Sequence, residues 1–112
     1  MNQFNFKSQP CTSHEQSEKL LALGLKKETA DCYWFYCDIA KEWKCTILSS
    51  TQVFEDYPTT VIPAWSLNRL IEMYVERYIS CSMNLKNLTY EWIINEIEIH
   101  IKEGDFNKEY LV

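Results

Sequence analysis

The sequence predicts a small single domain of the α+β class, in which a helix, a β-hairpin and two further helices packed on the hairpin share one core. Three observations lead to this fold: a helix-capping pattern near residue 13, an aromatic run over residues 31–38 followed by alternating apolar residues up to position 47, and a helical apolar stripe after position 62. The chain has 112 residues, of which 46% are hydrophobic. That is the size and composition of one ordinary globular domain.

The first helix is predicted to begin at Ser13. In "SHEQ" the serine hydroxyl and Gln16 have the spacing of a capping box, which satisfies free N–H groups of the first helical turn. Gly24 follows an apolar run and supplies the left-handed residue that commonly closes a helix. The residues before the cap show no periodicity, so we expect residues 1–12 to form a loosely ordered arm and residues 13–112 the single α+β domain.

A β-hairpin is predicted next. "DCYWFYCD", residues 31–38, is a run of β-favouring aromatic residues, and in residues 42–50 Trp43, Cys45 and Ile47 alternate with Lys44, Thr46 and Leu48. Alternation with period two is typical of strands, although no Asn-Gly turn lies between the two segments. A helix across residues 30–43 is the alternative interpretation. Residues 51–60 are interpreted as a connection, or as a short edge strand.

The second predicted helix spans "IPAWSLNRLIEMYVERYIS", residues 62–80. Pro63 suits the first turn of a helix, because a proline there gives up an N–H group that has no partner in any case. The apolar side chains follow the 3.6-residue spacing of one helix face: Leu67, Leu70, Ile71, Tyr74, Val75 and Tyr78. For residues 79–87 the sequence is consistent with either a short strand or a loop.

The last element poses a conflict, because "EIEIHIK", residues 96–102, alternates like a strand. Thr89 as a cap and Gly104 just beyond the end favour a helix instead, which leaves Ile99 partly exposed. A helical stripe supports this choice: Tyr90, Ile94, Ile97 and Ile101. The tail is expected to pack back onto the domain through Phe106, Tyr110 and Leu111.

The charge argues against a nucleic-acid surface. The net charge is −5, and only Arg69 and Arg77 are arginines. Nucleic-acid domains usually carry a basic stripe, and none is visible here. No segment reaches the roughly 18 to 20 apolar residues of a membrane span, and the N-terminus has no secretory pattern. We therefore expect a cytoplasmic protein without a membrane partner.

The cysteines are odd in number and irregularly spaced: Cys11, Cys32, Cys37, Cys45 and Cys81. In a reducing compartment this predicts free thiols, mostly buried, rather than a disulfide framework. A structural zinc site needs four converging ligands. Cys11 and His14 have a suitable spacing, but Cys32 and Cys37 are five apart in a predicted strand and should point to opposite faces. The sequence therefore predicts no metal ligand, and His14 is interpreted as an exposed residue.

No catalytic signature is present. His14 and His100 lack motif residues around them, and the chain contains no phosphate-binding glycine loop. Glu96 and Glu98 are two positions apart, which separates them on a helix. We therefore expect a protein that is not an enzyme, with no catalytic residues and no cofactor.

The corner "LLALGLKKETADCYWF" has the helix-glycine-apolar order seen in helix-turn-helix DNA readers. Leu20 argues against that function, because the motif usually has a small residue where its helices cross. The segment after the turn is acidic and aromatic and offers no arginine for guanine. Lys26 and Lys27 are interpreted as surface residues. DNA reading is therefore not favoured.

The aromatic content, 14% with four tryptophans, favours an interaction protein. Surfaces rich in Tyr and Trp are typical of interfaces, although most of these rings, Trp65 among them, are expected in the core. The leading expectation is a non-catalytic accessory protein that acts through protein contacts, with an unknown protein or with a second copy of itself. A nucleic-acid-associated regulator is the alternative.

Three sequence blocks carry a resemblance to other proteins, by their residues and by their order along the chain: "SHEQSEKLLALGLKKETAD", "IPAWSLNRLIEM" and "IKEGDFNKEYL". With them the chain resembles a group of small proteins from prophages and mobile elements of Bacteroides-type bacteria. The blocks cover about two-fifths of the chain. The resemblance implies an origin in mobile DNA. It implies no activity and no site residues, because the group has no established function.

Overall fold

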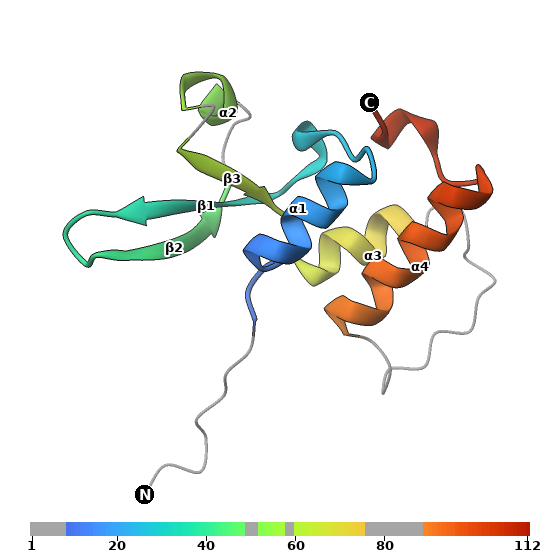
Figure 1. The fold of residues 1–112 in the computed structure, drawn as a ribbon, viewed down its shortest axis with the longest axis horizontal. Coiled ribbons are helices and arrows are strands. Elements are labelled where there is room, and N and C mark those ends of the chain that lie inside the picture. Colours follow the sequence, from blue (N-terminus) through green and yellow to red (C-terminus); the bar gives the residue numbers. More distant parts are fainter. Residues whose placement is uncertain (1–8, 49–51, 58–59, 76–88) are drawn as a thin grey trace, which may run out of the picture.

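The computed structural model of the chain describes residues 9–48, 52–57, 60–75 and 89–112. Its helices are α1 (His14–Ala22), α2 (Gln52–Asp56), α3 (Leu67–Val75) and α4 (Tyr90–Glu103). Its strands are β1 (Cys32–Cys37), β2 (Glu42–Ile47) and β3 (Val61–Ala64). Helices and strands together in one small domain confirm the predicted α+β class (Figure 1).

The cap and the closing corner of α1 are as predicted. The Ser13 hydroxyl accepts from the Gln16 N–H, and the Gln16 side chain accepts from the Ser13 N–H. Gly24 has a φ of 106°, and the N–H of buried Leu25 returns to the Leu20 carbonyl at 3.1 Å. A single 3₁₀ turn, Lys27–Thr29, then leads into β1. The corner is therefore followed by a strand and not by a DNA-reading helix.

The sheet has the strand order β2-β1-β3, and both pairings are antiparallel. β1 and β2 form the predicted hairpin, with Cys32 opposite Ile47 and Cys37 opposite Glu42. This pairing rules out the alternative helix across residues 30–43. The turn between the strands contains Lys41 with a φ of 57°.

The prediction for residues 62–66 was wrong. Pro63 lies in β3, opposite Tyr33 of β1, and α3 begins only at Leu67. A proline fits the outer edge of a sheet as well as a first helical turn, because at neither place is its missing N–H needed. Trp65, placed by the sequence at the start of a helix, is instead buried between β3 and α3.

The segment before β3 also differs from its prediction. Residues 52–56 form the short helix α2, which contacts β3 and buries Phe54. Pro58 lies outside the described residues. Residues 76–88 also lie outside them, so the choice between a strand and a loop at 79–87 is not tested.

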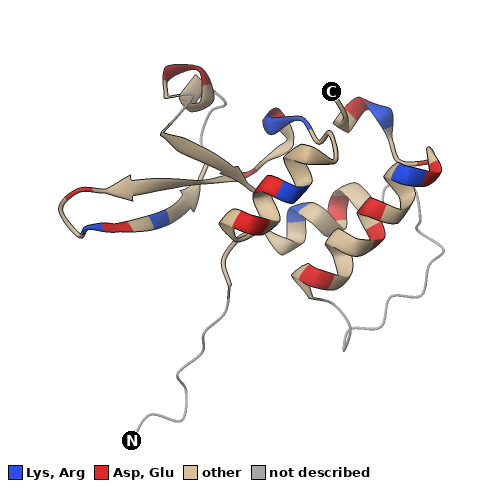
Figure 2. Ribbon diagram, viewed as in Figure 1, with Lys and Arg blue, Asp and Glu red and all other residues tan. Residues whose placement is uncertain are grey.

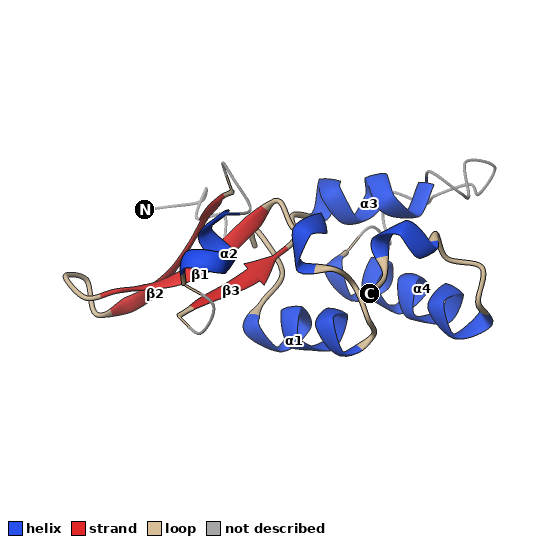
Figure 3. Cartoon of the chain, turned by 90° about the horizontal axis from the view of Figure 1, so that it is seen from above, coloured by secondary structure: helices blue, strands red, loops and turns tan. Residues whose placement is uncertain are grey.

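The main core lies among α1, α3 and α4 and not on the hairpin. It is made by Leu20, Leu25, Ala30, Phe54, Trp65, Leu70, Met73, Tyr74, Ile93, Ile94, Ile97 and Phe106. Figure 3 shows these three helices at one end of the molecule and the sheet at the other. The expectation that both later helices pack on the hairpin was therefore wrong: the sheet meets the helical core at one end, and the hairpin extends beyond it.

The last helix and the tail follow the prediction. α4 is capped by Thr89, ends at Gly104 with a φ of 81°, and leaves Ile99 39% exposed. Leu111 pairs with Leu25 in an isolated bridge, and the Val112 N–H donates to the Gly24 carbonyl at 2.7 Å. The tail thus returns to the corner after α1.

At the other end of the chain, the predicted arm lies outside the described residues for positions 1–8. Cys11 and Thr12, at the end of that segment, are buried, and the Thr12 N–H donates to the Trp65 carbonyl at 2.8 Å. Packing therefore begins before the expected boundary at residue 13. None of the helices in the described part of the chain combines the length and the apolar character that crossing a bilayer requires.

Candidate functional site

Exposed apolar side chains are concentrated on the β1–β2 hairpin. Of the seven large apolar residues exposed in the described chain, four lie between positions 36 and 47. Ile39 in the turn is 98% exposed, Ile47 at the end of β2 80%, Tyr36 47% and Trp43 41%. We call these four residues the hairpin surface. Figure 2 shows that the charges of the hairpin lie at its turn and on β2, while most of β1 carries none.

One face of the hairpin is an aromatic cluster that includes His14. The His14 ring lies edge-on to Trp34 at 5.2 Å and to Trp43 at 4.8 Å between centroids. Tyr36 packs against Trp43 at 5.8 Å, also edge-on. Edge-to-face pairs of this kind stabilise a fixed ring arrangement. The interpretation of His14 as a simply exposed residue was therefore wrong, because its ring holds the start of α1 against the hairpin.

The opposite face of β1 borders a groove of about 470 Å³ beside α2. Tyr33 and Phe35 from β1 and Val53 and Tyr57 from the α2 segment supply most of its apolar wall, and Asp38 supplies an acidic group. Aromatic residues therefore line both faces of the hairpin. A continuous aromatic run in a strand places rings on both faces, but the position of α2 beside them could not be read from the sequence.

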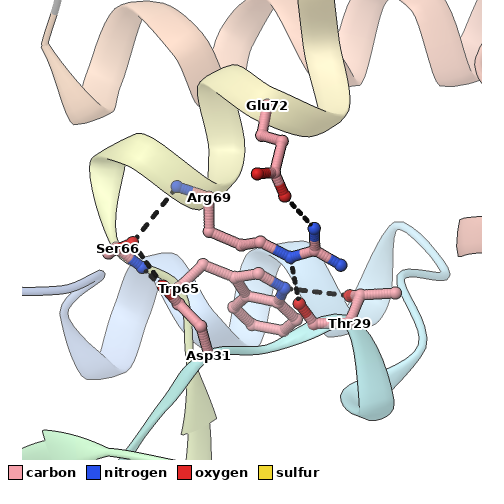
Figure 4. A network of polar contacts seen from close by, with 6 residues as sticks. All are labelled: Thr29, Asp31, Trp65, Ser66, Arg69 and Glu72. Atoms are coloured by element: carbon pink, nitrogen blue, oxygen red, sulfur yellow. Dashed lines mark hydrogen bonds and ion pairs between the residues drawn. The ribbon is translucent and has the colours of Figure 1, made fainter. Parts of the chain in front are cut away.

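A polar network joins the start of β1 to the start of α3 (Figure 4). The Asp31 carboxylate accepts from the Ser66 N–H at 2.8 Å and from the Ser66 hydroxyl at 2.5 Å. The Ser66 hydroxyl accepts in turn from the Arg69 N–H at 3.1 Å, which caps α3. The Arg69 side chain donates to the Thr29 carbonyl at 2.8 Å and forms an ion pair with Glu72. These groups are used within the fold, so the network is structural.

The cysteines differ from their prediction. Cys11 and Cys45 form a disulfide across 34 positions of sequence, whereas Cys32 and Cys37 are free. Burial, reinforced by the neighbouring Asp31 carboxylate, raises the pKa of the Cys32 thiol to about 11. Spacing alone could not reveal the pair, because the fold brings the end of the N-terminal segment onto β2.

The second histidine, His100, has surroundings different from those of His14. His100 Nδ1 lies 2.9 Å from an Asp105 oxygen, and its ring contacts Tyr74 at 5.7 Å between centroids. One ligand atom each of His100, Glu103 and Asp105 lies within 4.8 Å of the others, and both carboxylates are exposed. The sequence missed this group because Gly104 turns the chain back at the end of α4.

The two acids separated on α4 have different partners. Glu96 accepts from the Tyr74 hydroxyl at 3.1 Å. Glu98 lies between Lys19 at 2.9 Å and Lys102 at 3.0 Å. These two hydrogen-bonded lysines hold the pKa of the Glu98 carboxyl below its usual value. The pair predicted to diverge therefore does so, and each carboxylate binds a neighbouring side chain.

Comparison with known proteins adds no assignment: the chain matches no family model, no curated protein and no solved structure.

Proposed function

We propose that this protein is a non-catalytic accessory protein that acts by binding another protein through the hairpin surface. The observation that carries the proposal is the concentration of exposed Tyr36, Ile39, Trp43 and Ile47 on one projecting hairpin. Single exposed apolar residues are normal on a monomer, whereas a group of them commonly marks a contact surface. Tyrosine and tryptophan in particular are enriched in interfaces.

The charges of the hairpin favour a protein partner over nucleic acid. Lys41 and Lys44 are offset by Asp38 and Glu42, so the projecting end has no excess of positive charge. Binding to phosphate backbones depends on such an excess. A protein surface with apolar side chains and mixed charges is complementary to this hairpin.

The origin in mobile DNA and a cytoplasmic location belong to the same proposal. The first rests on the three sequence blocks that resemble prophage proteins. The second has a direct test, because cytoplasmic thiols are normally kept reduced. Because Cys11 is buried, cells of a Bacteroides-type host are opened in denaturant together with an alkylating reagent: Cys11 and Cys45 should be labelled thiols if the protein resides in the cytoplasm, and an unlabelled disulfide would contradict that location.

The central experiment compares capture by the wild-type chain and by the double variant Ile39→Ser/Trp43→Ser. Ile99→Ser, which removes an exposed apolar side chain from α4, is the matched control. We expect a specific host protein to bind the wild type and the control, and to be lost from the hairpin variant. Circular dichroism and thermal unfolding establish that the variants remain folded. Capture of nuclease-sensitive DNA or RNA instead, or equal capture by all three chains, would contradict the proposal.

A further inference from the structure

The two edges of the sheet differ in their ability to accept another strand. Neighbouring residues of an antiparallel strand turn their backbone groups alternately to one side and the other. The Leu48 N–H donates to the Asp31 carbonyl at 2.8 Å, which identifies this pair as hydrogen-bonded. Counting from it along the register, Glu42, Lys44 and Thr46 bond to β1.

The remaining β2 residues, Trp43, Cys45 and Ile47, therefore direct their N–H and C=O groups away from the sheet. Within the described part of the chain, no backbone partner meets these groups. At the other edge, the same alternation turns Pro63 of β3 outward, where a proline has no N–H to offer. The sheet thus has one edge closed by proline and one open edge, which is the kind of edge that pairs with another chain.

We propose that the open edge of β2 pairs antiparallel with β2 of a second copy of this chain, about a two-fold axis at Trp43. This pairing adds a second copy of the chain to the host protein as a partner of the hairpin surface, and in that respect rests on the proposed function. The product is a continuous six-stranded sheet with the two hairpins at its centre. Trp43 of each copy lies opposite Trp43 of the other, in a hydrogen-bonded pair.

The charges on β2 select this register. With the axis at Trp43, Glu42 of each copy lies opposite Lys44 of the second copy, so two opposite-charge pairs form. An axis at Glu42 or at Lys44 would place like charges opposite each other, which is destabilising. An axis at Cys45 would place Glu42 opposite Leu48 and Lys44 opposite Thr46, so no charge pair would form. Glu42 and Lys44 lie 3.8 Å apart on the same strand and remain largely exposed, so both are available to a partner.

The apolar residues agree with the same register. With this register, Ile47 of one copy extends past Glu42 toward the turn of the other copy, which carries Ile39. These two are the most exposed apolar side chains of the hairpin. Trp43 already packs on His14, so pairing would join the aromatic clusters of the two copies. The register with its axis at Trp43 therefore satisfies the outward backbone groups of β2, pairs Glu42 with Lys44 and brings the exposed apolar side chains of the two hairpins together.

Sedimentation equilibrium over a wide range of concentration tests the proposal with four variants of the whole chain. Glu42→Lys and Lys44→Glu each turn both attractive pairs into repulsive ones, and we expect each to weaken dimerisation by roughly tenfold or more. The double variant Glu42→Lys/Lys44→Glu restores opposite charges at the same positions and should recover the dimer. Glu18→Lys on α1 makes the same change in net charge as Glu42→Lys and should leave the dimer unchanged.

Amide exchange by NMR gives a second readout that depends on the register. The Trp43 N–H should gain protection as the protein concentration rises, and the Glu42→Lys chain should lose that gain. A wild type that stays monomeric, single reversals without effect, or a double variant that does not recover the dimer would each overturn the inference. If the wild type is monomeric and Ile39→Ser/Trp43→Ser still fails to capture the host protein, the dimer alone is refuted. If the wild type dimerises and Ile39→Ser/Trp43→Ser captures the host protein as well as the wild type does, the proposed host-protein contact is refuted.

Discussion

The indole N–H of Trp65 donates to the hydroxyl of Thr29 at 2.9 Å, and both side chains are buried. The same hydroxyl donates to the Lys26 carbonyl at 2.6 Å. This relationship fixes the short turn after α1 to the junction between β3 and α3. It joins residues 36 positions apart in sequence.

Replacement of Thr29 by valine keeps the shape of the side chain but leaves the Trp65 N–H without its acceptor. A buried donor without a partner costs about 1–3 kcal/mol, and we expect a loss of that order in the free energy of unfolding. Thr29→Ser retains the hydroxyl and should lose clearly less. Urea unfolding followed by tryptophan fluorescence measures both. Equal losses in the two variants would show that the hydrogen bond is not the cause.

Gly24→Ala tests the corner after α1. At a φ of 106° a side chain is strained, and the added Cβ would meet only Val112 Cγ2 at 3.9 Å, which is an ordinary contact. The cost is therefore backbone strain of about 1–2 kcal/mol in the free energy of unfolding. Gly24→Asn should cost less, because asparagine tolerates positive φ better than alanine. Thermal and urea unfolding check the order, and an alanine variant as stable as the wild type would contradict it.

Reduction of the Cys11–Cys45 disulfide should lower stability. The bond closes a long loop across 34 sequence positions, for which the chain-entropy model gives a contribution of about 3–4 kcal/mol. Urea unfolding of Cys45→Ser, and of the wild type with and without reductant, measures this loss. Cys37→Ser, at a free cysteine, is the control and should unfold like the wild type. Alkylation of Cys11 and Cys45 in the oxidised protein would contradict the pairing.

Glu98 gives the stability a defined pH dependence. Its lysine partners hold the folded-state pKa of the carboxyl below the usual value of 4.5, so the ion pairs contribute stability above that value. The contribution is lost as the pH falls through the folded-state pKa. Glu98→Gln should therefore have a lower melting temperature than the wild type at neutral pH, and the difference should vanish in acid. Glu18→Gln is the exposed control, and a difference independent of pH would refute this account.

Local signals account for the elements that were predicted correctly. The cap at Ser13, the glycine at position 24 and the alternation around Trp43 each act within a few residues, so their physical effect is visible in the sequence. Pro63 shows the limit of this reasoning. A proline suits both the start of a helix and the outer edge of a sheet, and only pairing with β1 distinguishes the two.

For the candidate site, the sequence indicated an aromatic-rich chain but not which rings are exposed. Trp65 is buried, whereas Trp43 is 41% exposed, and the residues around each ring do not distinguish the two. The difference arises because β3 runs into the helical core and β2 lies at the edge of the sheet.

The amino-acid order was thus sufficient for the class of the fold, the cap and closing corner of α1, the hairpin and the last helix, since each depends on contacts between near neighbours. The tertiary structure decided the third strand, the Cys11–Cys45 pair, the exposure of the hairpin surface and the open edge of β2. Those features depend on which distant segments meet, because a strand becomes an edge and a side chain becomes buried only through its neighbours in space.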